Sequence, residues 1–139
     1  MRIRPFDRGD EAAAVALWEE CKLTRPCNDP HKDIARKLAV QAELFLVGLV
    51  DAAIAASVMA GYEGHRGWVN YLAVAPRYRS RGYGRALMRH VEELLIGRGC
   101  PKVSLLVRSS NVEALAFYRH LGYLPDEAIS LGKRLIPDA

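Results

Sequence analysis

Two short apolar runs near the middle of the chain, at 44–50 and 53–61, place the strongest constraint on its fold. Only Asp51 and Ala52 separate them, and each run has the length of a strand that lies buried in a sheet. Two such runs around a two-residue turn predict a pair of antiparallel strands. Asp51 also interrupts the most apolar region, so no uncharged stretch reaches the roughly 18 to 20 apolar residues that a bilayer span needs. We therefore expect a central sheet and no membrane partner.

The segments around this pair predict helices and further strands. From apolar spacing and from cap and stop residues, we expect helices at 7–21, 30–42, 82–97 and 111–122. Asp7, Asp29 and Asn111 can cap three of these helices, and Gly122 can end the last one. Further strands are expected at 3–6, 68–74, 102–107 and 129–136. The order of elements predicts a mixed α/β (α+β) fold.

The composition is that of one folded domain. The chain has 139 residues, of which 50% are hydrophobic and 26% are charged, which excludes a disordered or low-complexity chain. This length suits a single domain, and no repeat or composition break divides 1–139. The opening residues MRIRP precede no apolar segment with a cleavage site, so we expect no export signal and a cytoplasmic location.

The cysteines and histidines give no sign of a disulfide framework or a metal site. The three cysteines are odd in number and form no C-x-x-C pair. Nor do the histidines at 31, 90 and 120 have the spacing of metal ligands. We expect reduced cysteines and no bound metal.

A basic turn is the first sign of a ligand. Five arginines and no acidic residue lie between Pro76 and Val91, although the net charge is only +4. The segment Arg79 to Gly84 reads R-x-x-G-x-G and lies between an expected strand and an expected helix. Free N–H groups at a helix start, with glycines that let an anion approach the backbone, can hold a diphosphate. A solvated basic helix face, or a glycine-rich turn with no ligand, is the alternative. Neither a P-loop nor a Rossmann fingerprint is present.

A second motif gives this turn a more specific meaning. Residues Asn111 to Tyr123 read N-x-x-A-x-x-F-Y-x-x-x-G-Y, one helix and one strand after the basic turn. Together the two motifs resemble the GNAT superfamily of N-acetyltransferases. Residues 61–67 and 130–136 resemble the bacterial YpeA-type branch of that family. The resemblance implies a single-domain fold with a mixed, mostly antiparallel sheet flanked by helices.

The resemblance also implies a binding site for acetyl-coenzyme A, the acyl donor of the family. The diphosphate would lie on the basic turn and the pantetheine arm beside the main chain of the fourth strand. The implied cofactor-binding residues are Leu72, Ala73, Val74, Arg79, Ser80, Arg81, Gly82, Tyr83, Gly84, Arg85, Asn111, Phe117 and Tyr118.

The same resemblance suggests catalytic and acceptor residues. Tyr118 corresponds to the usual general acid of the family, although its place on an apolar helix stripe also suits a core tyrosine. Glu63 and His65 are the titratable residues nearest the fourth strand, so either is a candidate base and acceptor contact. Arg25 and Asn28 lie in the link between the first two helices, which forms a wall of the acceptor pocket in the family.

We therefore expect an enzyme that transfers acetyl from acetyl-coenzyme A directly to the primary amine of a small molecule. A protein N-terminal or lysine acetyltransferase is one alternative, and a non-catalytic acyl-coenzyme A binding module is another. Relatives that acetylate ribosomal protein N-termini carry glutamate where this chain has Leu106, which argues against an N-terminal acetyltransferase. Nucleic-acid binding is disfavoured because no aromatic platform accompanies the basic turn. The sequence leaves a homodimer open.

Overall fold

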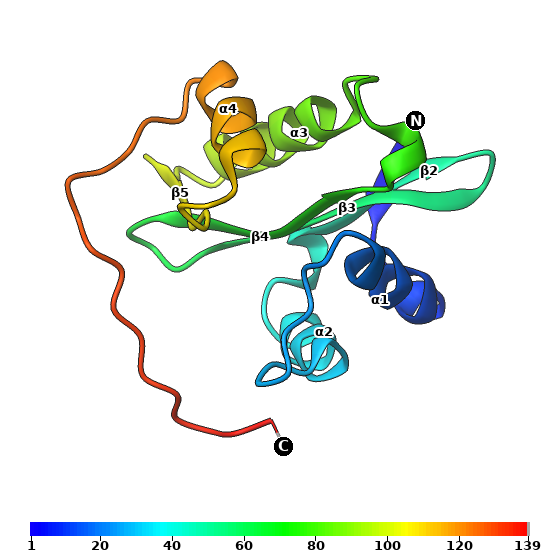
Figure 1. Cartoon of the computed structure of the whole chain (residues 1–139), viewed down its shortest axis with the longest axis horizontal. Coiled ribbons are helices and arrows are strands. Elements are labelled where there is room, and N and C mark those ends of the chain that lie inside the picture. Colours follow the sequence, from blue (N-terminus) through cyan, green and yellow to red (C-terminus); the bar gives the residue numbers. More distant parts are fainter. Residues whose placement is uncertain (139) are drawn as a thin grey trace.

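The two apolar runs form the hairpin at the centre of a five-stranded sheet in the computed structural model, which describes residues 1–138 (Figure 1). Strands β2 (Phe45–Val50) and β3 (Ala53–Tyr62) pair antiparallel. Asp51 and Ala52 between them have positive φ values of 51° and 65°. Two successive left-handed residues give a turn whose twist matches that of the flanking strands, so the predicted hairpin is confirmed.

The remaining strands extend this hairpin on both sides. Strand β1 (Arg2–Pro5) pairs with β2, and β4 (Gly67–Val74) pairs with β3, both antiparallel. Strand β5 (Val103–Leu105) lies parallel to β4 at the edge. Its pairing ends at Val69 and Leu105, so the last five residues of β4 have no strand beside them on that edge within residues 1–138. The expected mixed, mostly antiparallel sheet is confirmed.

Helices cover both faces of the sheet. Figure 1 shows α1 (Glu11–Glu20) and α2 (Pro30–Leu38) on one face, with α3 (Tyr83–Gly97) and α4 (Val112–His120) on the other. Short 3₁₀ turns occupy Arg8–Asp10, Ala42–Leu44 and Pro76–Tyr78. None of the helices among residues 1–138 is long and apolar enough to cross a membrane.

Two of the three predicted helix caps form where the sequence places them, whereas Asp7 precedes the 3₁₀ turn Arg8–Asp10 and α1 begins at Glu11 with Asp10 as its N-cap. Asp29 Oδ1 accepts the N–H of His31 at 2.9 Å, and Asn111 Oδ1 accepts the N–H of Ala114 at 3.1 Å. Helix α2 ends at Leu38, earlier than expected. The reason is Gln41, which adopts a φ of 55° while its side-chain amide bonds both the N–H and the C=O of Tyr62. This contact to β3 draws the chain out of the helix.

A bulge in β4 decides which residues of that strand face which helices. Between the pairs Met59–Asn70 and Ser57–Ala73, one residue of β3 lies opposite two residues of β4. One of these two is Tyr71, which has a φ of 52°. A left-handed conformation costs a residue with a Cβ about 1–2 kcal/mol. The extra residue shifts the alternation, so that Tyr71 and Ala73 pack toward α1 whereas Leu72 and Val74 pack toward α3 and α4.

The C-terminal segment does not form the strand expected at 129–136. Residues 121–138 have no helix or strand and pass the sheet edge to reach α2 (Figure 1). Ile129 and Leu131 are 88% and 91% exposed, because no strand among residues 1–138 lies beside them. Strand formation depends on packing against neighbours, which the local pattern does not report. The prediction was therefore wrong.

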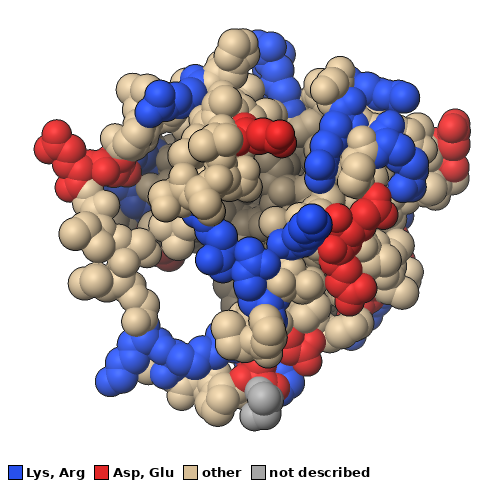
Figure 2. Space-filling view, viewed as in Figure 1, with Lys and Arg blue, Asp and Glu red and all other residues tan. Residues whose placement is uncertain are grey.

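One carboxylate attaches the end of this segment to α2. Asp138 Oδ1 lies 2.7 Å from Arg36 Nη2, and its Oδ2 accepts the backbone N–H of Asp29 at 2.7 Å. These contacts, with Arg134 alongside, lower the pKa of Asp138 to about 2. Figure 2 shows that the segment encloses an opening between itself and the rest of the molecule.

Candidate functional site

A cleft of about 570 Å³ lies between the end of α1, the free part of β4, the start of α3 and helix α4. Every cofactor residue predicted from the sequence lines it except Arg81. Residues that the sequence did not indicate line it as well, and these are Cys21, Leu23, Tyr78, Glu113, Ala114, His120 and Leu121. Figure 2 shows a hollow in this face with Lys and Arg side chains gathered around it.

The basic turn forms one end of the cleft and has an unusual backbone. Ser80 and Gly82 have φ values of 64° and 80°, and Gly82 is the N-cap of α3. Alternation of left-handed residues points successive N–H groups toward one concavity, which can bind an anion. The positive end of the α3 dipole adds to this. A Cβ on Gly82 would meet no atom within 4 Å, so the glycine leaves open space at this concavity.

Gly84 has a different role from Gly82. A Cβ at this buried position would lie 3.2 Å from Cζ of Phe117 and 3.6 Å from Cγ2 of Val74. The missing side chain therefore lets α3 approach both α4 and β4. The second glycine of the motif therefore serves the packing of α3 against α4 and β4, next to the turn.

The free edge of β4 forms the floor of the cleft. The N–H of Ala75 donates to the C=O of Ala55 on β3 at 2.8 Å. Because backbone groups alternate in direction along an antiparallel strand, those of Leu72 and Val74 point away from β3. The C=O of Val74 accordingly accepts Arg79 Nε at 3.2 Å and the thiol of Cys21 at 3.4 Å. The N–H groups of Leu72 and Val74 are thus directed into the cleft.

Some arginines of the turn make contacts within the protein, whereas others extend into solvent. Arg79 connects the end of β4 to α1, because its Nη2 lies 3.6 Å from the sulfur of Cys21 in addition to the Val74 bond. Arg81 lies over the ring of Tyr78, with Cζ 5.5 Å from the ring centroid. Arg85 is exposed at the mouth of the cleft.

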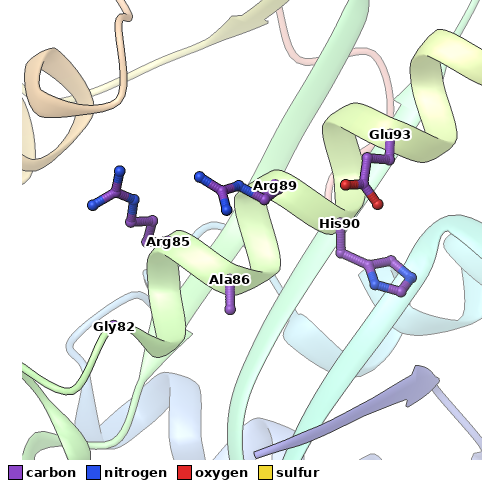
Figure 3. Close-up of a pocket in the computed structure, with 6 residues that line it drawn as sticks. All are labelled: Gly82, Arg85, Ala86, Arg89, His90 and Glu93. Carbon is purple, nitrogen blue, oxygen red and sulfur yellow. The ribbon is translucent and has the colours of Figure 1, made fainter.

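A second groove, of about 350 Å³, continues from the cleft along the outer surface of α3. It shares Gly82 and Arg85 with the cleft and also contains Arg89. Figure 3 shows the guanidinium groups of Arg85 and Arg89 on the same side of the helix, one turn apart, while His90 points to another side. Two adjacent cations that lie next to an anion-binding turn suit a second anionic group of the same ligand.

Tyr118 lies in the cleft wall with its ring enclosed by other aromatic rings. Its centroid is 5.0 Å from that of Phe117 and 5.7 Å from that of Tyr123, both edge to face. Burial raises the pKa of Tyr118 to about 12. Its hydroxyl makes no hydrogen bond to residues 1–138, whereas the Tyr123 hydroxyl donates to Glu92 at 2.6 Å. Tyr118 is therefore a protonated, unengaged donor at neutral pH.

The structure does not bring Glu63 and His65 to the cleft. Both are exposed in the loop before Gly67, at the opposite end of β4 from Leu72, and five strand residues span roughly 15 Å. Glu63 Oε1 accepts the N–H groups of His65 and Arg66, and this contact with Arg66 lowers the pKa of Glu63. This carboxylate stabilises its own loop, and its position gives no support to a role as base.

The two predicted acceptor residues lie in the α1–α2 link. Arg25 is exposed, and its Nη1 donates to the C=O groups of Lys22 and Thr24 at 3.0 and 2.9 Å. Asn28 donates from Nδ2 to the hydroxyl of Tyr71 at 3.1 Å. Neither residue lines the cleft, because Asn28 contacts Tyr71 on the opposite face of β4 and only Cys21 and Leu23 of this link reach the cleft. Within residues 1–138 no group of His, Cys, Asp and Glu could hold a metal ion.

Comparison with known proteins agrees with this geometry. Residues 11–123 match the sequence profile of the Acetyltransferase (GNAT) family. An acetyltransferase of Yersinia enterocolitica is 49% identical over 138 residues, which cover 99% of this chain and 98% of the relative.

Two solved structures share the fold at higher divergence. Ard1 from Thermoplasma volcanium superposes with a TM-score of 0.80 at 25% identity, covering 88% of this chain and 82% of that one. The ribosomal-protein-S18-alanine N-acetyltransferase from Escherichia coli has a TM-score of 0.72 at 27% identity, covering 87% of this chain and 76% of that one.

The turn at Gly82 yields a test of the cleft as a coenzyme A site. We expect Gly82→Val to weaken coenzyme A binding by roughly 10-fold or more, because the side chain strains a left-handed position and fills the concavity. Isothermal titration calorimetry measures this affinity. Gly97→Val is the matched control, since a Cβ at Gly97 also meets no atom within 4 Å but lies at the other end of α3. Equal affinity in folded Gly82→Val and wild-type protein would contradict the assignment of the turn.

Proposed function

The chain belongs to the GNAT family of acetyltransferases, and we propose that it transfers acetyl from acetyl-coenzyme A directly to the primary amine of a small molecule. The observation that carries this proposal is the cleft, which joins an anion-binding turn, a free strand edge and the Tyr118 hydroxyl. These three parts match the diphosphate, the amide-bearing arm and the thiol of coenzyme A in that order. A cytoplasmic location accords with the use of this donor.

In this proposal the chain binds the donor mainly through its backbone. The N–H groups at Ser80 and Gly82 hold the diphosphate, and the free edge of β4 lies along the pantetheine arm and the thioester at its end, as a neighbouring strand would. Arg85 and Arg89 hold the remaining phosphate in the groove on α3. Asn111 and Phe117 close the cleft from α4.

The reaction is an acyl transfer without a covalent enzyme intermediate. The amine attacks the thioester carbonyl, the oxygen becomes negative, and a β4 N–H stabilises it. The carbon–sulfur bond then breaks, the nitrogen gives its extra proton to water, and the thiolate takes a proton in turn from water. With pKa values of about 12 for Tyr118 and about 8.5 for a thiol, full transfer from Tyr118 is roughly 5 kcal/mol uphill. Tyr118 therefore acts by donating a hydrogen bond that strengthens as sulfur gains charge.

The amine loses its proton to water in this scheme. For an alkyl ammonium with a pKa of about 10.4, this costs roughly 4.6 kcal/mol at pH 7. A peptide α-amine costs about 1 to 1.4 kcal/mol under the same conditions. Activity on alkyl amines should accordingly rise with pH toward the pKa of the amine.

A protein N-terminal acetyltransferase is the second candidate, because the Escherichia coli neighbour is named for that activity. Leu106 speaks against it. This side chain is 69% exposed and apolar at the position where such relatives carry a glutamate. An N-terminal α-amine would therefore have to lose its proton without help from a carboxylate at this position.

A thiol-release screen tests the proposed function. Acetyl-coenzyme A is incubated with amino acids, polyamines, aminoglycosides and short peptides, and mass spectrometry identifies the acetylated product. We expect release with at least one small primary amine. Release with peptides alone would favour the second candidate, and binding of coenzyme A without release would favour a non-catalytic module.

Replacement of Tyr118 by Phe tests the role of this hydroxyl as a hydrogen-bond donor to the leaving sulfur. We expect kcat to fall by roughly 100-fold or more while the affinity for acetyl-coenzyme A changes little, because the ring still packs on α4. Because its raised pKa keeps Tyr118 protonated, wild-type kcat should show no decline from this group below about pH 11. Tyr123→Phe is the control, since its hydroxyl donates to Glu92 and does not line the cleft. Equal losses in the two variants would contradict the role of Tyr118.

Replacement of Arg89 by Gln tests the groove on α3. Wild-type protein should bind coenzyme A about 3- to 10-fold more tightly than 3′-dephospho-coenzyme A, since the exposed guanidinium gains a charged partner. The variant should lose most of this preference, as measured by calorimetry with both ligands. Arg2→Gln on β1 serves as the control for loss of one positive charge. A preference that survives in Arg89→Gln would exclude this groove as the phosphate site.

A further inference from the structure

Tyr71 has a backbone conformation that its side chain does not favour. It lies at the bulge of β4 with a φ of 52°, where glycine is the usual residue. It follows Val69, the last residue of β4 that pairs with β5, by two positions. Strained residues persist where several contacts fix them, and they gather at functional sites. The contacts of Tyr71 therefore indicate which function its left-handed conformation serves.

A buried polar chain holds the backbone of Tyr71 from inside the core. The indole Nε1–H of Trp18 donates to Oγ of Ser57 at 2.8 Å, and the Ser57 hydroxyl donates to the C=O of Tyr71 at 2.9 Å. Both Trp18 and Ser57 are fully buried. A buried hydroxyl is costly unless it is bonded, and here both of its bonds serve the bulge.

The side chain of Tyr71 is held as firmly as its backbone. Its ring stacks on Trp18 with centroids 3.9 Å apart. Its hydroxyl donates to Asp33 Oδ2 at 2.7 Å and accepts Asn28 Nδ2 at 3.1 Å. Asp33 belongs to α2 and Asn28 to the α1–α2 link, so one residue connects the bulge to the helices on the face opposite the cleft.

The bulge determines the chemistry of the cleft floor. Without the extra residue, the alternation of β4 would turn Leu72 and Val74 toward α1 and would redirect their N–H groups. With it, these N–H groups point into the cleft, where the proposed reaction needs a donor for the acyl oxygen. Anything that loosens Tyr71 would misdirect this donor without touching the basic turn or Tyr118.

We infer that Tyr71 is a positioning residue for acetyl transfer, which Ser57 and Trp18 fix in the left-handed conformation that aims the N–H groups of Leu72 and Val74 at the thioester. This inference rests on the proposed function, because it assigns the β4 edge to the acyl group. It goes beyond that function in giving a catalytic consequence to core residues that contact no ligand.

Ser57→Ala is the decisive variant, because it removes the only side-chain bond to the bulge carbonyl among residues 1–138. We expect kcat to fall by roughly 10- to 100-fold while KM for acetyl-coenzyme A stays within about 3-fold. Ser57→Thr retains the hydroxyl and should recover most of kcat. Val47→Ala is the matched control, since Val47 is the buried partner of Ser57 across β2 and β3, and its loss removes volume from the same core cluster while the Ser57 hydroxyl keeps its bond to the bulge carbonyl. It should lower Tm without changing kcat per folded molecule.

A binding readout separates this inference from the proposed function. Backbone amide NMR shifts are recorded as acetyl-coenzyme A is added to the folded proteins. In the wild type, the amides of Gly82, Leu72 and Val74 should all shift, whereas in Ser57→Ala only Gly82 should respond as in the wild type. No response at Gly82 in the wild type would overturn the proposed function. Wild-type responses at Leu72 and Val74 in Ser57→Ala, together with an unchanged kcat, would overturn the role of Tyr71.

Discussion

The bulge at Tyr71 is the constraint on which the rest of the structure depends. A single extra residue in β4 reverses the alternation of the strand, so that Ala73 enters the core under α1 while Leu72 and Val74 face α3 and α4. The same shift sets the direction of the free backbone groups at the strand edge. Because β5 pairs with β4 only as far as Val69, this edge stays open beside the bulge. The fold thereby leaves N–H groups at the edge of β4 free to form hydrogen bonds. An amide-bearing ligand can pair with this edge as a further strand would.

Two kinds of group are available to bind an anionic ligand, the backbone N–H groups of the basic turn and the arginine side chains around it. The N–H groups at Ser80 and Gly82 lie inside the turn, where left-handed conformations bring them together. The arginines lie around it, and Arg79 and Arg81 are occupied by Val74, Cys21 and Tyr78. Among the arginines of this segment, Arg85 and, in the groove, Arg89 extend guanidinium groups toward a ligand of the cleft. Loss of one arginine should therefore weaken binding less than distortion of the turn.

The local sequence pattern correctly predicted features that depend on contacts between residues close in the chain, such as helix caps and helix ends. Asp29 and Asn111 cap helices because their side chains reach the next N–H groups, and Gly122 ends α4 with a φ of 93°. The basic glycine turn was indicated by its own residues, whereas its partnership with the helix after Asn111 came from the family resemblance. Tyr71 was missed as a special residue because nothing in its neighbourhood shows that Ser57 and Trp18 would hold it left-handed. Glu63 is close to β4 in sequence but lies away from the cleft, at the other end of that strand. The strand expected at 129–136 needed a neighbouring strand, and none of the described residues provides one there.

The most direct test of this account observes the acyl carbonyl itself. Acetyl-coenzyme A labelled with ¹³C at the carbonyl is bound to the protein without an acceptor, and the isotope-edited infrared difference spectrum reports its stretching frequency. A hydrogen bond from β4 weakens the C=O bond, so the account predicts a bound band at lower frequency than in water, and a band narrowed by a single environment. A frequency equal to or higher than that of the free thioester would show that the strand edge does not polarise the carbonyl, and would contradict the central claim.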